Sequence, residues 1–477
     1  MDRRIMSIAL VGAFIGGGLV MWSGGGSLQP LSELGQPKHL LMVVVDTQRV
    51  DTMGFYNDAS VSTPRLDAWA GDAGVVFERA WSQGAYTMAS YMAYMTSTHV
   101  RTHGLDGDLG PGGICGWDDL TLLPEALAQE GFGTTAFVAN SNLHPKKGFP
   151  RGFETWNDLE VETQLGSQPL TRKDYVRSDR KVVSSGIAQM KAWSSDEREF
   201  LYLHLMAPHL PLAPSRPARK ALDLPVKGPE ARPIPLKEIR KLRREHTPED
   251  EVRTRQGYQA SVWDGDRYIT QILNGLEASG HADDTLVVLL SDHGEEIWEH
   301  GDYGHQDGVW EQLVHVPLVV RQPGRPAGRV SRPVMLIDVA PTLLELLGLE
   351  VPTGWQGHNL FEPEPERLVV TERFDERAAT FDGTFKAIWR NDGEGRWRFF
   401  DLEKDPTEQR PLAGQGERAQ RLKDAALRWA LATPEADRSD NLVPSGICGT
   451  LGKAEAEEHM KLLEQLGYVD PDDGTEE

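Results

Sequence analysis

The sequence predicts an α/β protein with a mostly parallel central sheet. Two aliphatic runs, residues 40–45 (LLMVVV) and 286–290 (LVVLL), are typical of strands buried on both faces of such a sheet. Strand and helix patterns alternate between and around these runs, which indicates helices on both faces. An acidic residue follows each run, Asp46 and Asp292. Because ligands bind beyond the carboxyl ends of strands in open α/β sheets, we expect the functional site at these two residues.

The alternating pattern defines a main domain, which we place at residues 37–365. The further elements predicted within it are strands at residues 75–77, 134–138 and 200–205, and helices at residues 256–276 and 338–347. After residue 365 the pattern changes to short strands separated by turn residues. We therefore expect a small α+β subdomain at residues 366–435, with strands at 381–389 and 396–402, and then a tail at 436–477 with a charged helix at 454–466.

The N-terminal segment has the composition of an export signal. Arg3 and Arg4 precede the almost uncharged residues 5–22, so residues 1–26 fit either a cleaved signal peptide or an N-terminal membrane anchor. In both cases the main domain is exported, to the periplasm or the cell exterior, and an anchor would associate it with the membrane through residues 5–22. The net charge of −22 argues against nucleic acid as a partner.

The chain contains two cysteines, and both are flanked by glycine. An even number of cysteines in an oxidising compartment favours a disulfide between Cys115 and Cys448. The alternative is two unpaired buried thiols.

The two strand-end acids predict a metal site. For one such residue alone, a turn or a helix cap would be the preferred interpretation. Two of them, with His293 next to Asp292, favour a divalent cation, and this donor set suits Zn²⁺ or Mn²⁺ better than Ca²⁺. A cation at Asp46, Asp292 and His293 would polarise an ester oxygen and activate a hydroxyl group.

For two other segments, the spacing of the residues does not decide between a functional and a structural role. Residues 86–97 are rich in hydroxyl groups, and Thr87 or Ser90 is either a nucleophile or an ordinary helix cap. Residues 215–255 contain 12 Lys and Arg against 7 Asp and Glu in an otherwise acidic chain. Such a segment is either a solvated surface or a basic lid that attracts anionic substrates.

The chain resembles the sulfatase family of the alkaline phosphatase superfamily. The resemblance runs from about residue 38 to the C-terminus and rests on motifs in the family's order: VVDTQRVD at 44–51, YTMAS at 86–90, SDHGE at 291–295, HVPL at 315–318, IDVAPTLL at 337–344, FDL and DPTE within 400–408, and LGY at 466–468. It implies an alkaline phosphatase-like three-layer sandwich. It also implies that the main domain is the catalytic domain of a hydrolase acting on sulfuric or phosphoric esters.

The resemblance also implies roles for particular residues. The metal ligands would be Asp46, Thr87, Asp292 and His293, with Thr87 as nucleophile as well. The further candidates are His209 and Arg49 as catalytic contacts to the anionic ester group, and His305, Lys146 and Lys147 as substrate-binding residues. Thr47 stands where many sulfatases carry a second aspartate ligand, so the expected cation (Zn, Mn or Ca) has fewer charged ligands here.

The nucleophile motif departs from that of conventional sulfatases. Those enzymes convert Cys or Ser to formylglycine, whereas oxidation of the secondary alcohol of Thr87 would give a ketone. Ala89 and Tyr91 also replace the proline and arginine of the modification signal. We therefore expect no formylglycine.

Three functions fit these observations. The first is an exported metal-dependent hydrolase that cleaves a small-molecule or glycan sulfate or phosphate ester through Thr87. The second is a phosphoethanolamine-type transferase that acts on an envelope lipid or glycan. The third is a catalytically degenerate member that binds anionic glycans.

Overall fold

The computed structural model describes residues 35–106, 119–158 and 172–435, apart from residues 233, 235, 306–307, 365, 374–375, 391–394 and 415. The predicted N-terminal segment 1–26, both cysteines and the tail helix at 454–466 lie outside the described residues, so they stay predictions. Among the helices that are described, none is long and apolar enough to cross a membrane.

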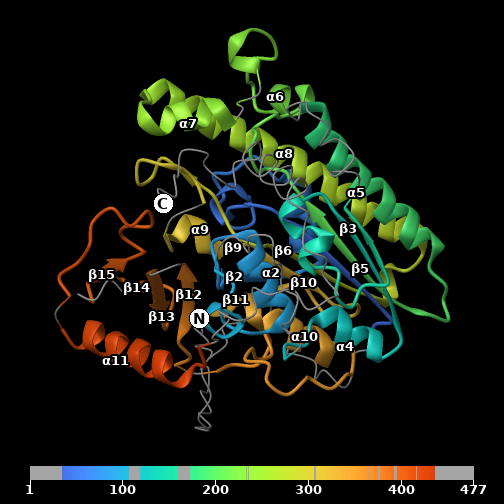
Figure 1. The fold of residues 1–477 in the computed structure, drawn as a ribbon. Helices are drawn as coiled ribbons and strands as arrows, with labels where there is room; N and C mark the ends of the chain where they lie inside the picture. The colour runs from blue at the N-terminus through green and yellow to red at the C-terminus, as the bar shows by residue number, and fades with distance from the viewer. Residues whose placement is uncertain are drawn as a thin grey trace, which may run out of the picture.

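A mostly parallel sheet forms the centre of the molecule (Figure 1). Its strands follow the order β11-β2-β10-β6-β1-β5-β3-β4, and β9 pairs with β2. Of these strands, β9 and β10 run antiparallel to their neighbours. The bounds are β1 (His39–Val45), β2 (Val75–Trp81), β3 (Phe132–Val138), β4 (Thr155–Asn157), β5 (Arg198–Leu205), β6 (Thr285–Ser291), β9 (His315–Val316), β10 (Leu318–Arg321) and β11 (Gly328–Met335). The α/β fold predicted from the sequence is confirmed.

Helices cover both faces of this sheet and explain the continuous aliphatic runs. In β1, Leu40, Met42 and Val44 belong to one core, and the intervening residues of the strand belong to another. The first core includes α2 (Thr87–Thr96), α4 (Leu123–Gln129) and α10 (Val339–Leu346), and the second includes α1 (Pro64–Ala73), α5 (Arg172–Ala192) and α8 (Pro248–Ser279). Both faces of β1 are therefore buried, and the molecule has three layers.

Short elements connect the layers. They are η2 (Val50–Thr52), α3 (Val100–His103), η4 (Ser141–Leu143), η5 (Pro145–Lys147), η8 (Ala282–Asp284), β7 (Glu296–Ile297), β8 (Tyr303–Gly304), α9 (Glu311–Val314) and η9 (Leu336–Asp338). The helix predicted at 338–347 corresponds to η9 and α10, and Gly348 follows it with a φ of 72°, in the left-handed region that favours glycine.

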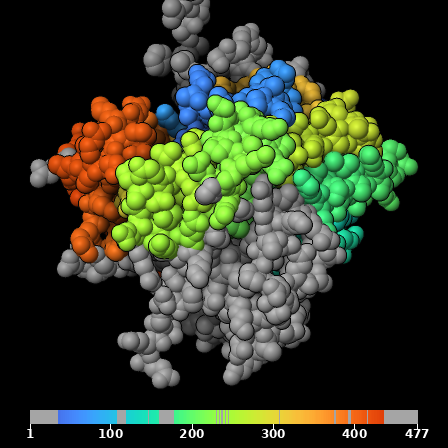
Figure 2. Space-filling view, turned by 90° about the horizontal axis from the view of Figure 1, so that it is seen from above, coloured from blue at the N-terminus to red at the C-terminus, as the bar shows by residue number. Residues whose placement is uncertain are grey.

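The basic segment, residues 215–255, packs against the rest of the protein. It forms α6 (Arg216–Ala221), η7 (Pro229–Ala231), α7 (Leu236–Arg244) and the first turns of α8. Ile239 packs in a small core with Trp298 and Tyr303, and Arg243 donates to the Tyr303 carbonyl at 2.7 Å. Figure 2 shows this segment, in green, at the surface beside the orange C-terminal subdomain.

The C-terminal subdomain is a four-stranded antiparallel sheet, within the described residues, with one helix against it. Its elements are β12 (Val369–Arg373), β13 (Glu376–Thr380), β14 (Phe385–Arg390), β15 (Trp397–Asp401) and α11 (Glu417–Ala432). The predicted strand at 396–402 corresponds to β15. The strand predicted at 381–389 begins too early, since residues 381–384 form the turn before β14. The sequence predicted two strands and the subdomain has four. The strands β12 and β13 were not predicted, because they are short and rich in charged residues.

A buried ion pair joins this subdomain to the main domain. Lys386 of β14 is fully buried, and its Nζ lies 2.9 Å from Glu408 Oε1 and 3.2 Å from Glu311 Oε2 of α9. Burial raises the pKa of Glu408 to about 7, in spite of the nearby Lys386 charge. The DPTE motif of the sequence therefore contributes a carboxylate to the contact between the two domains.

Candidate active site

The strand-end acids meet where the sequence predicted them. Strands β1 and β6 are parallel neighbours with Val45 opposite Ser291, so Asp46 and Asp292 leave the sheet side by side. Both aspartates and His293 are fully buried. Their candidate ligand atoms all lie within 4.8 Å of one another.

The polar atoms of this cluster fit a divalent cation. Asp46 Oδ1 and Asp292 Oδ2 are buried and have no hydrogen-bond partner among the described residues. His293 Nδ1 lies 2.9 Å from the Gly294 carbonyl, to which it donates, so that Nε2 is left as the electron-pair donor. This Nε2 atom lies 3.7 Å from Asp46 Oδ1 and 3.6 Å from Asp292 Oδ2. Burial and the adjacent charge of Asp46 raise the pKa of Asp292, an electrostatic cost that a bound cation would remove.

The hydroxyl group of Thr87 faces the same cluster. Thr87 is the first residue of α2 and is fully buried, and its Oγ1 lies 3.3 Å from His293 Nε2. Ser90, one turn later, donates to the Asp292 carbonyl at 2.7 Å and so fixes the start of α2 against the end of β6. Amide groups in the first turn of a helix favour negative charge, which suits an anionic ester at Thr87.

Two contacts of Asp46 were not predicted from the sequence. Asn140 donates through Nδ2 to Asp46 Oδ2 and lies 3.3 Å from Thr87 Oγ1. His204 of β5 places Nε2 3.4 Å from the same Asp46 oxygen, and its Nδ1 lies 2.9 Å from the Tyr202 hydroxyl. Asn140 follows the predicted strand at 134–138 by two residues, the same signal that identified Asp292. His204 gave no signal, because it lies inside a strand.

Two of the other predicted histidines join the site. The His305 ring lies 4.5 Å from His293 and 5.3 Å from His209, measured between ring centroids. His305 Nδ1 is 2.8 Å from Glu295 Oε1. Burial lowers the pKa values of His293 and His305 and raises that of Glu295 to about 8. The two imidazoles are therefore neutral near pH 7.

The loop that carries His209 is fixed by a buried carboxylate. Asp179 of α5 accepts hydrogen bonds from the backbone amides of Met206 at 2.7 Å and Ala207 at 3.1 Å. Burial raises the pKa of Asp179 to about 7, although both hydrogen bonds act in the opposite direction.

The guanidinium of Arg49 is bound by two carboxylates and a backbone carbonyl. Its guanidinium binds Asp51 at 2.7 and 3.0 Å, Glu299 at 3.0 Å and the Glu295 carbonyl at 2.9 Å. These partners use all three of its nitrogen atoms. The expected contact of Arg49 with ester oxygens stays a prediction, since these partners hold the guanidinium in place without a substrate present.

The predicted lysines lie in η5. Lys147 is buried, with 1% of its surface exposed, and the side chain of Lys146 lies outside the part of the structure that is described. Substrate binding by these two residues stays a prediction.

A cavity of about 260 Å³ is lined by residues of both domains. Gly304, the neighbour of His305 in the chain, lines it together with Arg390 and Arg398 of the C-terminal subdomain. The rings of His300 and Trp310 also line it and stack on each other at 3.7 Å. Three carboxylates, Glu296, Asp302 and Glu376, line it as well, and Glu376 Oε1 lies 3.0 Å from Arg390 and 2.8 Å from Arg398, so the charges of the two arginines are paired.

This fold, with its polar cluster at the carboxyl ends of β1 and β6, defines an alkaline phosphatase-like hydrolase of sulfuric or phosphoric esters. More particularly, the chain belongs to the sulfatase family, since the family model described as Sulfatase matches residues 38–349.

Individual relatives agree with this membership. The chain is 26% identical over 436 residues to an ulvan-active sulfatase of Formosa agariphila, covering 83% of this chain and 81% of the relative. It is 22% identical to an N-acetylglucosamine-6-O-sulfatase of Bacteroides thetaiotaomicron, covering 83% and 86%. A phosphonate monoester hydrolase of Silicibacter pomeroyi has a similar fold, with a TM-score of 0.68, 19% identity and coverage of 84% and 97%.

Proposed function

We propose that the protein hydrolyses a sulfate or phosphate ester of a glycan, with Thr87 as nucleophile. A divalent cation, for which the donor set favours zinc or manganese, would be held by Asp46, Thr87, Asp292 and His293. The observation that carries the proposal is the position of Thr87 Oγ1, 3.3 Å from His293 Nε2 and next to two carboxylates with unsatisfied oxygens.

Each group of the site has a role in this reaction. The cation, when bound, would lower the pKa of the Thr87 hydroxyl and offset charge on the ester oxygens. Thr87 Oγ1 attacks sulfur or phosphorus in line, and the bond to the substrate oxygen breaks as the new bond forms. Water then attacks the same atom, which releases sulfate or phosphate and restores the hydroxyl. Asn140 orients Asp46 and Thr87, and His209 contacts the anionic oxygens of the ester.

The names of two relatives support a carbohydrate as the alcohol part of the substrate. The two relatives reported above are named for ulvan and for N-acetylglucosamine 6-O-sulfate, which agrees with such a substrate.

A comparison of Thr87→Ala with Thr87→Ser tests the nucleophile. Activity on nitrophenyl sulfate, nitrophenyl phosphate, a phosphodiester and sulfated oligosaccharides would be measured for both variants. We expect Thr87→Ala to lose at least about 10³-fold in kcat, as for other nucleophiles, and Thr87→Ser to retain turnover. Equal rates for the wild type and Thr87→Ala on the best substrate would refute the assignment.

The same experiment separates the alternative functions. Transfer of the phospho-substituent to an added alcohol in place of water would favour the transferase. Failure to bind any divalent metal, with no turnover of any ester, would favour a glycan-binding protein without activity.

We also propose that residues 1–26 direct export. The mass of the intact protein from its native host distinguishes a removed signal from a retained anchor. Recovery of the full-length protein in the cytoplasm would contradict export.

A further inference from the structure

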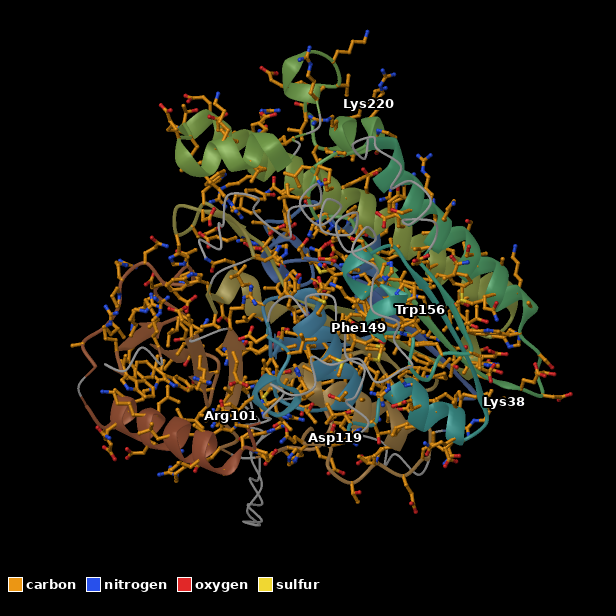
Figure 3. The ribbon with its side chains drawn as sticks, in the orientation of Figure 1. Lys38, Arg101, Asp119, Phe149, Trp156 and Lys220 are labelled. Atoms are coloured by element: carbon orange, nitrogen blue, oxygen red, sulfur yellow. The ribbon has the colours of Figure 1, made fainter. Side chains whose placement is uncertain are left out.

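A second cluster of metal-ligand side chains lies at the opposite end of the sheet from Thr87. His39 is the first residue of β1, His281 follows α8, and Asp284 is the last residue of η8. The seven residues of β1 separate His39 from Asp46, which is roughly 23 Å at 3.3 Å per residue. Figure 3 labels the neighbouring Lys38 at the lower right of the molecule, far from Lys220 of the basic segment at the top.

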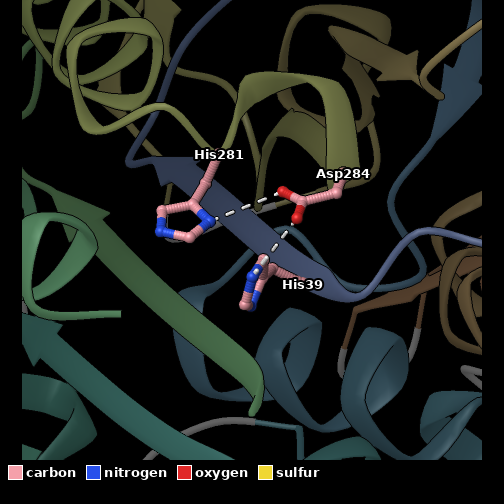
Figure 4. Close-up of side chains that lie close together, drawn as sticks. All are labelled: His39, His281 and Asp284. Atoms are coloured by element: carbon pink, nitrogen blue, oxygen red, sulfur yellow. Dashed lines mark ion pairs between the residues drawn. The ribbon is translucent and has the colours of Figure 1, made fainter. Parts of the chain in front are cut away.

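The three side chains point toward one another (Figure 4). His39 Nε2 lies 3.8 Å from Asp284 Oδ2, and His281 Nδ1 lies 3.7 Å from Asp284 Oδ1. The ligand atoms of the set all lie within 4.8 Å of one another. Donors at about 2.1 Å from a tetrahedral zinc ion are about 3.4 Å apart, so each of these two pairs is a few tenths of an ångström wider than in a zinc site.

The distant ion pair with Asp284 does not explain why the His39 ring is buried. This side chain is fully buried, and neither ring nitrogen has a hydrogen-bond partner among the described residues. Its ring stacks on Trp193 with 4.7 Å between centroids, which fixes its orientation. A buried polar group without a partner costs about 1–3 kcal/mol, and a cation at Nε2 would supply a partner for one of the two nitrogens. Burial lowers the pKa of His39 to about 4, so its ring is neutral and able to donate an electron pair.

We propose that His39, His281 and Asp284 form a second metal site, with Zn²⁺ as the favoured ion. Two imidazoles and one carboxylate are typical zinc donors, and water would complete the coordination because the Asp284 side chain is 32% exposed. The ion ties the start of β1 to the connection between α8 and β6. Its role is structural, since the nucleophile lies at the other end of the strand.

Zinc binding to the full-length chain tests this site without any activity measurement. The Asp292→Asn background weakens the active-site metal, so that the second site dominates. His281→Gln and Asp284→Asn are then added separately, and His246→Gln is the matched control because His246 forms a similar surface pair with Glu251 at 3.2 Å. Bound zinc is counted by mass spectrometry after dialysis, and Co²⁺ spectra report tetrahedral coordination.

We expect about one zinc ion per chain in Asp292→Asn alone and with His246→Gln. Either His281→Gln or Asp284→Asn should weaken this binding by more than the roughly 10–100-fold that loss of an outer-shell partner costs. Added zinc should raise the Tm of Asp292→Asn and of its His246→Gln form. It should not raise the Tm of the forms with His281→Gln or Asp284→Asn, whose circular dichroism confirms folding. Zinc binding and Tm shifts that are the same in all four proteins, or no zinc in any, would overturn the proposal.

Discussion

Replacement of His204 by phenylalanine should weaken metal binding at the active site. His204 does not belong to the proposed ligand set, but its Nε2 donates to Asp46 Oδ2 at 3.4 Å. Phenylalanine fills a similar volume and removes this donor. Asp46 keeps the hydrogen bond from Asn140, so the carboxylate loses one of its two donors.

The size of the effect follows from these contacts. A hydrogen bond to a charged group contributes about 1.5–3 kcal/mol, and the long distance favours the lower end of this range. About 1.5 kcal/mol corresponds to a roughly 10-fold loss of metal affinity, which agrees with the 10–100-fold effect of outer-shell partners. The Tyr202 hydroxyl keeps a partner in Tyr94 at 2.9 Å, so we expect a smaller loss of stability than of affinity.

A competition assay with a chromophoric chelator measures the affinity directly. Tyr94→Phe is the control, because it removes the far end of the same hydrogen-bond chain and leaves His204 on Asp46. We expect this variant to bind metal within about twofold of the wild type. Equal metal affinities of His204→Phe and Tyr94→Phe would show that the contact of His204 with Asp46 does not strengthen metal binding.

Three further predictions concern the framework of the site. Lys386→Met should lower the unfolding free energy by about 3–5 kcal/mol, because it leaves Glu408 buried without its cation; a urea titration measures this, and part of the loss should return when Glu408→Gln is added. Asp179→Asn should flatten the pH dependence of stability. The folded protein holds a proton on Asp179 up to about pH 7 that the unfolded chain releases near pH 4, so the wild type loses up to about 4 kcal/mol as pH rises through this window; urea midpoints from pH 4 to 8 that remain parallel for the two proteins would contradict the assignment. Gly294→Ala would place a Cβ atom 2.0 Å from the Gln312 carbonyl oxygen, so the backbone beside the metal ligands must move; we expect a lower Tm and loss of activity, and unchanged values of both would contradict this.

The fold and the centre of the site could be predicted because the residues that form them produce recognisable patterns in the sequence. A strand buried on both faces must be aliphatic throughout, and the acid after it stands out, as at Asp46 and Asp292. The grouping of these two residues follows from the pairing of β1 with β6, which the general rule for α/β sheets anticipates.

The remaining contacts depend on tertiary structure that no local pattern contains. His204 has the sequence context of a core residue, and only the pairing of β5 with β1 brings it to Asp46. The ion pair of Arg49 with Glu299 could not be predicted either, because the two residues are far apart in the sequence. The strands β12 and β13 were missed because their charged residues conceal the period-two pattern on which strand prediction depends.

The most direct test of Thr87 as nucleophile is mass spectrometry of the protein quenched during turnover. The peptide containing Thr87 should carry a sulfo or phospho group in the quenched protein and should be unmodified in the absence of substrate. The adduct should be absent from Thr87→Ala. An adduct on another residue, or turnover by Thr87→Ala at the wild-type rate, would contradict this role of Thr87.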